Sequence, residues 1–509
     1  MTLARALSLS LAAAAGAATV FGFAPFGLAA LPVATLVVLF WQWHDAVSAR
    51  DAAGTGFAFG LGLFGAGASW LYIAIQTFGG MPAPLAALAI ALLVAYLALW
   101  PAAAGWLTAR YAPRQSAARL LVAAGAFTLA EWLRGYVFTG FPWLTLGYSQ
   151  VPGGWLRGYA PIGGVFLVSL ALTLCAALVV HGAGALARGA GRAATLAACA
   201  TLALLALGAG LARIEWTTPA GAPVAVSLVQ GNILQDEKFD PGFRSDTYDR
   251  YLRLVDSSRG RLVVLPESAF PVFSDEVPDA VLLALIRTAI ARNGDVLLGL
   301  FTELPPLPGS RAPRYFNTVV ALGAGDLQFY RKHHLVPFGE TIPLEPVFGW
   351  IIRSVLSIPL ADQARGPAYQ APLEVAGQKV AVDICYEDAF GSELIPAARR
   401  AGMLVNVTND AWYGHSIAAR QHDQIAAMRA VEFGRPMLRA TNTGITSAIG
   451  PDGRALGELP WFTTGILEVS VAGREGDTPY LRFGDALVLA ASIVLVAAPI
   501  VVVRSRRRR

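Results

Sequence analysis

Residues 380–387 read VAVDICYE, a short run of branched apolar side chains that ends at a thiol. The run predicts a buried strand, and Cys385 follows directly at the end of that strand. The other two cysteines, Cys175 and Cys199, lie inside long apolar runs, where a small hydrophobic residue is ordinary. One remaining thiol forms neither a disulfide framework nor a zinc knuckle, so Cys385 is either packed in a core or a nucleophile.

Further short apolar runs of this kind surround Cys385. They lie at 224–229, 262–265, 296–300, 318–322 and 403–407, and helical periodicity appears at 278–292 and 418–433. Strands that alternate with helices predict an α/β layered domain. We place this domain at 220–475, where charged residues occur at the density of an ordinary soluble domain.

The rest of the chain has the composition of a membrane protein. Overall, 55% of the residues are hydrophobic and 14% are charged, whereas soluble domains carry about 25% charged residues. The net charge of +5 gives little support to nucleic-acid binding. The sequence therefore predicts a membrane bundle joined to one soluble domain.

Eight apolar stretches are long enough to be transmembrane helices, which need about 20 residues. The first could instead be a signal peptide, although its apolar run continues past any good cleavage site. Seven helices are assigned to a bundle at 1–215, an eighth to 484–503, and a basic cytoplasmic tail to 504–509. The stretches lie near 6–24, 27–44, 56–77, 83–108, 118–136, 160–182, 192–212 and 484–503.

Arginine residues alternate between the loops of this bundle. Arg50, the 110–119 loop, the 188–192 loop and the 504–509 tail carry positive charge, which predicts that these ends are cytoplasmic. The intervening loops carry almost none, so the domain at 220–475 is expected on the outer side, in the periplasm.

Two more charged residues follow predicted strands. Glu267 comes directly after VVLP, and Lys332 comes directly after LQFY and an arginine. Sites form at strand ends in layered α/β folds. A carboxylate can take the proton of a thiol, and an ammonium can stabilise the oxyanion of acyl transfer. Each of the three residues also has a purely structural explanation, and spacing alone does not show that they meet.

The motifs around these residues resemble the carbon–nitrogen hydrolase (nitrilase) superfamily, whose triad is Glu, Lys and Cys in this order. LPE at 265–267, YRKHHLVPFGE at 330–340 and ICYE at 384–387 carry the resemblance. Together with the membrane helices, VQGN at 229–232 and NVTNDAWYG at 406–414 narrow it to the apolipoprotein N-acyltransferases. The resemblance implies an α-β-β-α catalytic domain beside the eight-helix membrane bundle.

The resemblance also implies roles for individual residues. Glu267 is expected to be the general base, Lys332 the electrostatic stabiliser and Cys385 the nucleophile. Supporting positions are Glu340, which would hold Lys332 charged, with Tyr386 and Glu387; Glu387 could equally be a structural hydrogen-bond partner. Phe239 stands where the family often has Trp, so an aromatic substrate platform would persist without an indole N–H.

The implied activity is a two-step transfer of a fatty acyl chain in lipoprotein biosynthesis. A membrane phospholipid would donate the chain to Cys385 as a thioester, and the α-amine of a diacylglyceryl-modified apolipoprotein cysteine would accept it. No cofactor and no metal are expected, since His333 and His334 are adjacent and no ligand cluster joins them. One alternative is a membrane-anchored amidase with the same triad. Another is a transporter, for which Glu131 and Arg134 offer ionisable groups near one helix end, although they lie three apart on one face and could simply pair.

Overall fold

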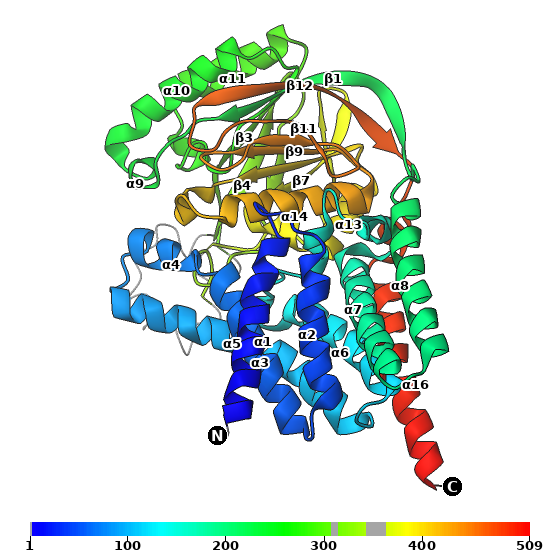
Figure 1. Cartoon of the computed structure of the whole chain (residues 1–509). Helices are drawn as coiled ribbons and strands as arrows, with labels where there is room; N and C mark the ends of the chain where they lie inside the picture. Colours follow the sequence, from blue (N-terminus) through cyan, green and yellow to red (C-terminus); the bar gives the residue numbers. More distant parts are fainter. Residues whose placement is uncertain (1–2, 307–313, 343–362, 509) are drawn as a thin grey trace. The chain divides into compact units, whose positions relative to one another are not determined.

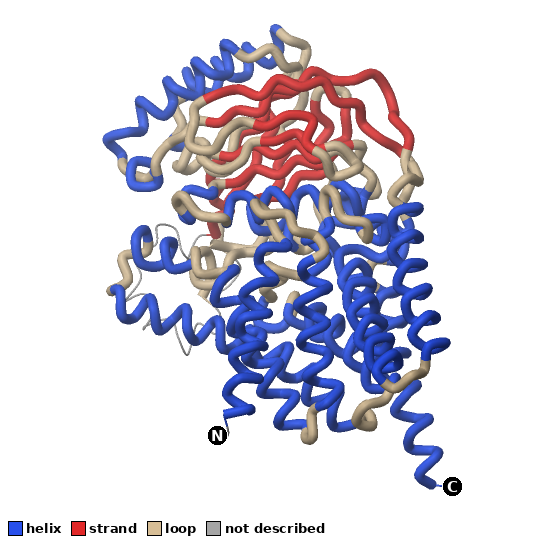
Figure 2. The backbone as a smooth tube through the Cα atoms, viewed as in Figure 1, coloured by secondary structure: helices blue, strands red, loops and turns tan. Residues whose placement is uncertain are grey.

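The computed structural model describes residues 3–306, 314–342 and 363–508. The chain divides into two compact units. The bundle unit comprises Met1–Leu71, Pro84–Ile214 and Arg482–Arg509, and the sheet unit comprises Tyr72–Ala83 and Glu215–Leu481. The first unit is helical, and the strands lie in the second (Figure 2).

Each of the eight apolar stretches contains a helix in the structure. Four segments, Leu3–Gly22, Ala83–Tyr111, Arg157–Ala187 and Gly191–Leu211, are long and apolar enough to cross a membrane, and a bent pair could make a fifth. Eight crossings therefore stay a prediction. Of the basic tail, Arg509 lies outside the described residues. The helices of the bundle are α1 (Leu3–Thr19), α2 (Leu31–Asp45), α3 (Ala49–Gly67), α5 (Ala83–Tyr111), α6 (Ala117–Arg134), α7 (Ala160–Ala187), α8 (Gly191–Leu211) and α16 (Ala486–Arg508), with 3-10 turns at Val20–Gly22, Val137–Thr139, Leu146–Gln150 and Arg157–Tyr159.

The membrane helix predicted near 56–77 is interrupted in the structure. α3 ends at Gly67, and the chain bends by 61° into α4 (Leu71–Ile73) and a π-helical turn, η2 (Ala74–Phe78). The indole N–H of Trp70 donates to the carbonyl of Gly67 at 2.9 Å, so this side chain satisfies one of the carbonyl groups left free where the helix ends. The turn after the bend belongs to the sheet unit, where the ring of Phe78 lies 6.2 Å from that of Trp412.

Glu131 and Arg134 hold the loop that follows α6. Glu131 accepts a hydrogen bond from the backbone N–H of Leu146 at 2.9 Å, and Arg134 donates to the carbonyl groups of Phe141 and Trp143. Trp143 is 2% exposed, so it packs inside the bundle unit rather than anchoring a membrane surface. The two ionisable side chains therefore have a structural explanation, and they give the transporter alternative no support.

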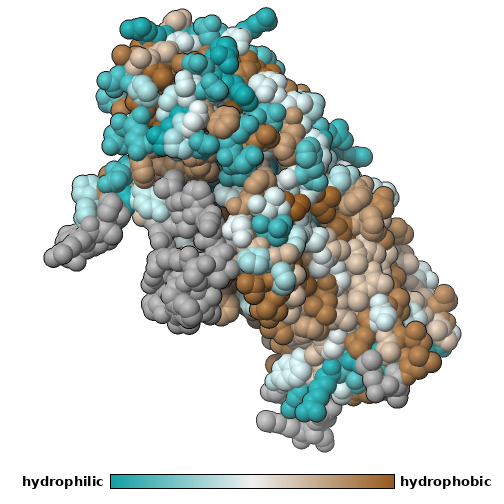
Figure 3. All heavy atoms as spheres, turned by 90° about the vertical axis from the view of Figure 1, so that its left-hand side faces the viewer, coloured by the Kyte–Doolittle hydropathy of each residue, from teal (hydrophilic) through white to brown (hydrophobic). Residues whose placement is uncertain are grey.

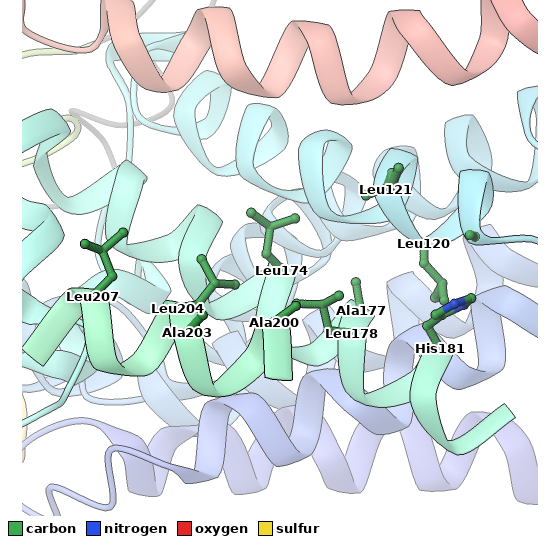
Figure 4. Close-up of a pocket in the computed structure, with 11 residues that line it drawn as sticks. Leu120, Leu121, Leu174, Ala177, Leu178, His181, Ala200, Ala203, Leu204 and Leu207 are labelled. Atoms are coloured by element: carbon green, nitrogen blue, oxygen red, sulfur yellow. The ribbon is translucent and has the colours of Figure 1, made fainter. Parts of the chain in front are cut away.

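The bundle unit also contains an apolar groove of about 460 Å³ between α6, α7 and α8 (Figure 4). Leu120, Leu174 and Leu204 contribute to its lining, and His181 lies at one end. Apolar residues also cover much of the bundle surface in the view of Figure 3, whereas the sheet unit shows more hydrophilic residues. None of the predicted site residues lines this groove, because all of them belong to the sheet unit.

Two six-stranded sheets form the sheet unit. Of the six branched apolar runs predicted as strands, five lie within observed strands, and the run at 262–265 extends one residue past the observed strand Leu262–Val264. The strands that were not predicted are Leu373–Val375, Met437–Thr441, Ser447–Ile449, Ala455–Glu458 and Gly465–Glu475. The first sheet has the order β12 (Gly465–Glu475), β1 (Thr218–Gln230), β2 (Leu262–Val264), β3 (Asp295–Leu304), β4 (Arg314–Leu322), β5 (Gln328–Arg331). The second has the order β11 (Ala455–Glu458), β10 (Ser447–Ile449), β9 (Met437–Thr441), β8 (Met403–Thr408), β7 (Gln378–Ile384), β6 (Leu373–Val375).

Helices cover the outer face of each sheet, which gives the α-β-β-α layering (Figure 1). α10 (Arg244–Ser257) and α11 (Asp279–Ala291) pack on the first sheet through Tyr251 and Leu285, which lie in one core with Leu298. α13 (Gly391–Ala398) and α14 (Ala418–Phe433) pack on the second. The remaining elements are α9 (Gln235–Lys238), α15 (Pro479–Phe483) and the 3-10 turns η6 (Pro241–Phe243), η7 (Ser274–Glu276), η8 (Cys385–Ala389) and η9 (Asp410–Tyr413).

Strand directions bring the predicted site residues to common edges. β2 and β3 are parallel, and β4 is antiparallel to both β3 and β5. β5 therefore runs in the same direction as β2, so Glu267 and Lys332 follow strands that end at one edge of the first sheet. β7, β8 and β9 are parallel in the second sheet, and Cys385 follows β7.

Candidate active site

Glu267, Lys332 and Glu340 meet in one buried cluster. The Lys332 ammonium lies 2.7 Å from a carboxylate oxygen of Glu340 and 3.4 Å from Oε1 of Glu267. The side-chain amide of Asn317, on β4, donates to the same Glu267 oxygen at 2.7 Å. The Lys332 side chain is 0% exposed, so its charge depends on the two carboxylates beside it.

Those carboxylates keep Lys332 protonated. Burial alone would lower the pKa of Lys332, but the charges of Glu340 and Glu267 outweigh it and raise this pKa above its usual value. Glu340 is fixed in turn, because its second oxygen accepts from the backbone N–H of Val336 at 2.9 Å. The predicted role of Glu340, ordering Lys332 as a cation, agrees with this geometry.

Cys385 begins the 3-10 turn η8, directly after β7. Its φ of +56° lies in the left-handed region, which side chains other than glycine rarely adopt. Burial first, and then the charge of Glu267, raise the pKa of the Cys385 thiol well above its ordinary value, while Lys332 lowers it. The resting thiol therefore carries its proton and needs a base when it attacks.

Glu387 joins the turn of Cys385 to the end of β5. Its two oxygens accept from the backbone N–H groups of Ile384, His333 and His334 at 2.7, 2.7 and 3.0 Å, and from the hydroxyl of Tyr330 at 2.9 Å. Four donors on one carboxylate that is itself buried favour the structural explanation for Glu387. It links the strand end that leads to Lys332 with the one that leads to Cys385.

We expect Glu387→Gln to reduce both activity and stability. An amide nitrogen cannot accept hydrogen bonds, so at least one of the four donors loses its partner, which costs about 1–3 kcal/mol for a buried group. The thermal midpoint of the purified protein and its acyl-transfer rate are the measurements. Glu374→Gln, which changes an exposed carboxylate on β6, should alter neither. Full activity in Glu387→Gln at an unchanged midpoint would contradict this role.

The third predicted supporting residue, Tyr386, lies in this turn, and His333 and His334 lie beside it. Tyr386 is 7% exposed, and its ring meets that of Phe390 edge to face at 5.0 Å. His334 stacks on Phe390 at 3.5 Å and hydrogen-bonds Glu393, and His333 bonds to the carbonyl of Gly366. Both histidines thus have protein partners.

Phe239 is half-buried and ends α9, directly after Lys238. We expect Phe239→Ala to impair acyl transfer more than Phe239→Trp, because a flat apolar surface is kept only by the second change. Steady-state rates with a lipid donor are the measurement. Phe243→Ala, at an aromatic ring that is 40% exposed in the neighbouring turn, is the matched control. Equal activity of Phe239→Ala and the unchanged protein would leave Phe239 as a packing residue.

Lys238 is a buried cation that the sequence analysis missed. Its ammonium donates to the backbone carbonyl of Glu267 at 3.0 Å, and its side chain is 4% exposed. Burial lowers the pKa of Lys238 to about 8, although the charges of Glu267 and Cys385 oppose this. A lysine in a short polar segment is usually exposed, so the sequence predicts a surface charge at Lys238. Only the structure shows that this side chain is buried beside Glu267.

Two of the family-like motifs also meet near the site. The amide of Asn409 donates to Gln235 at 2.9 Å, and Asn442 donates to Asn409 at 3.0 Å and to the carbonyl of Ile233 at 2.7 Å. These bonds connect the segment after β1 to the ends of β8 and β9. Amide side chains therefore join the two sheets where the strand ends converge.

Two stacked sheets with a thiol, a carboxylate and an ammonium at their strand ends define the class of cysteine-dependent carbon–nitrogen hydrolases. Residues 225–480 match the family model described as carbon-nitrogen hydrolase. Residues 15–178 match a second model, the apolipoprotein N-acyltransferase N-terminal domain.

Relatives similar over nearly the whole chain narrow this class. An apolipoprotein N-acyltransferase of Nitrosomonas europaea is 48% identical, with 97% of each chain covered. Those of Chromobacterium violaceum and Ralstonia nicotianae are each 44% identical, and the alignments cover 97% and 98% of this chain and 94% and 93% of theirs. The chain belongs to the apolipoprotein N-acyltransferase family.

Proposed function

We propose that this membrane protein transfers a fatty acyl chain from a phospholipid to the α-amino group of a diacylglyceryl-modified N-terminal cysteine, completing lipoprotein maturation. The buried cluster of Glu267, Lys332 and Glu340 beside Cys385 is the observation that carries this proposal. It supplies a base, a fixed cation and a nucleophile, which acyl transfer requires.

In the first step, Glu267 takes the thiol proton while the sulfur of Cys385 attacks the ester carbonyl of the phospholipid. The Lys332 ammonium stabilises the oxyanion that forms. The ester C–O bond then breaks, the leaving oxygen takes the proton from Glu267 and becomes the hydroxyl of the lysophospholipid, and the acyl chain stays on Cys385 as a thioester.

In the second step, the neutral α-amine of the acceptor attacks the thioester carbonyl. Glu267 takes a proton from the attacking nitrogen, the C–S bond breaks, and the proton returns to the sulfur of Cys385. The products are an amide-linked acyl chain and the free thiol.

One contact within the sheet unit supports a lipid donor. The segment Tyr72–Ala83, which the sequence places between two apolar helices, packs on the turn that contains Trp412. Gly414, at the end of that turn, faces Ile73. The segment Tyr72–Ala83, which is flanked by membrane helices, therefore contacts the motif at 406–414 that precedes α14. Asp410 of this motif raises the pKa of the Cys385 thiol.

The test is the mass of the purified protein after incubation with phospholipid alone. We expect a gain of one fatty acyl mass on the peptide containing Cys385, removable by neutral hydroxylamine. Addition of a diacylglyceryl peptide should then discharge the adduct into an amide. A protein that hydrolyses amides without any lipid would instead support the membrane-anchored amidase, which the named relatives do not favour.

We further propose eight membrane crossings, with 220–475 in the periplasm and 504–509 in the cytoplasm of a bacterial inner membrane. The alternation of arginine-rich and arginine-poor loops supports this arrangement. We expect a reporter that is active only in the cytoplasm to function when fused after Arg509. The same reporter inserted in the 308–312 segment should be silent. The opposite pattern would overturn the topology.

A further inference from the structure

A second buried cluster of charges lies directly behind Cys385, and the proposed function assigns it no role. His422 comes from α14, Asp388 from η8, Asp410 from η9 and Arg439 from β9. Each of the four side chains is at most 1% exposed. Figure 1 shows α14 lying along the second sheet, which contains β7 and β9.

The surroundings of His422 fix its charge. Its Nδ1 lies 2.8 Å from a carboxylate oxygen of Asp410, and its Nε2 lies 3.1 Å from a carboxylate oxygen of Asp388 and 3.2 Å from the carbonyl oxygen of Cys385. All three partners accept hydrogen bonds, so both ring nitrogens must donate and the ring is an imidazolium. Burial and Arg439 lower the pKa of His422, but Asp388 and Asp410 outweigh them and raise it to about 9.

Arg439 supplies the second cation of the cluster. Its guanidinium lies 3.0 Å from the other oxygen of Asp410 and 3.4 Å from the other oxygen of Asp388. Two cations thus face two carboxylates, and the cluster of these four side chains is neutral. Removal of any one member would leave a net charge in a medium where charges are weakly screened.

The same cluster holds the backbone of the nucleophile. The carbonyl of Cys385 accepts from Nε2 of His422 and, at 3.1 Å, from the side-chain amide of Asn406. Cys385 has the left-handed φ of +56°, so its conformation must be stabilised by its surroundings. Two donors on its carbonyl provide that stabilisation and fix the direction of the side chain.

We propose that His422 is a positioning residue for Cys385, a buried imidazolium that holds the carbonyl of the nucleophile and balances the negative charges behind it. This inference rests on the proposed function, because it takes Cys385 as the nucleophile. The titratable and charged groups that act on the Cys385 thiol include Glu267, Lys332, Lys238, Tyr413, Asp410 and Arg439. His422 pairs with Asp410, and Asp388 pairs with Arg439, so both adjoin groups of this set.

The test compares three variants that change the charge of the cluster in different directions. His422→Gln removes a positive charge, Asp388→Asn removes a negative charge, and the double variant removes both. The readout is the pH midpoint for alkylation of Cys385 by iodoacetamide, followed on its own peptide by mass spectrometry. His415→Gln, at an exposed histidine that stacks on Phe462, is the matched control.

We expect the midpoint to rise by about 1 in His422→Gln, to fall by about 1 in Asp388→Asn, and to return near the original value in the double variant. His415→Gln should leave it unchanged. The acyl adduct should form up to about tenfold more slowly in His422→Gln at neutral pH, because Glu267 must then remove the proton from a thiol whose pKa is about one unit higher.

A merely structural role predicts a different result. Both single variants would then slow adduct formation, and their midpoints would stay in place or move in the same direction, which would overturn the inference. If His422→Gln does not fold, Asp388→Asn tests the inference by itself, because the inference requires the pH midpoint for alkylation of Cys385 to fall in that variant. Failure of the proposed function is distinguishable, because the unchanged protein would then form no acyl adduct whatever the midpoints do.

Discussion

Cys385→Ala is expected to lose the acyl adduct and all acyl transfer. The thioester needs the sulfur of Cys385, and the methyl group of alanine offers no atom that could replace it. The measurement is the intact mass after incubation with phospholipid, together with turnover of a diacylglyceryl peptide. Cys199→Ala, at an exposed thiol of α8, should keep both.

The two readouts separate the covalent mechanism from direct transfer. An enzyme that only brought phospholipid and amine together would retain activity in Cys385→Ala and show no adduct in the unchanged protein. An active Cys385→Ala protein would therefore end the two-step mechanism for this chain.

Glu267→Gln is expected to slow formation of the acyl adduct by about 10²–10⁴-fold, the usual contribution of general acid–base help. The loss should be large because burial, the largest cause, raises the pKa of the Cys385 thiol and persists in the variant, so the thiol still needs a base. The rate of adduct formation from phospholipid, measured in single turnovers, is the test. Glu303→Gln, at an exposed carboxylate of β3, is the control.

The pH dependence gives a second prediction from the same variant. In Glu267→Gln the thiol must ionise by itself, so the remaining rate should keep rising with pH above neutrality. Removal of the carboxylate also leaves Lys332 paired with Glu340 alone. A loss smaller than tenfold, or a pH profile identical to that of the unchanged protein, would remove Glu267 from the role of base.

The sequence predicted the site through the ends of its strands. Glu267, Lys332 and Cys385 each follow a short apolar run. Such a run is typical of a strand that is buried on both faces. Six strands were predictable for the same reason, because their side chains are buried on both faces. The edge strand Gly465–Glu475, whose side chains are mostly partly exposed, lacked that pattern and was missed.

Other features depended on contacts between distant residues and were not predictable. Glu387 accepts hydrogen bonds from four donors, which lie in segments more than 50 residues away and next to its own turn. Nothing in the neighbouring sequence distinguishes it from a solvated residue. Lys238 reads as a surface charge until the carbonyl of Glu267 is placed beside it. The bend after Gly67 lies within a mainly apolar stretch, and the indole hydrogen bond that accompanies it is visible only in the structure.

The segment after the bend at Gly67 is made long before its packing partner in the sheet unit. Phe78 leaves the ribosome more than 300 residues before Trp412, its ring partner in the sheet unit. At about 5–20 residues per second, the interval is roughly 15–65 s. During this interval the turn that contains Trp412 has not been made, so the Tyr72–Ala83 segment cannot pack on it. The neighbouring helices α3 and α5 hold the segment until then. This contact of the sheet unit thus joins a piece of chain made early to a turn made late.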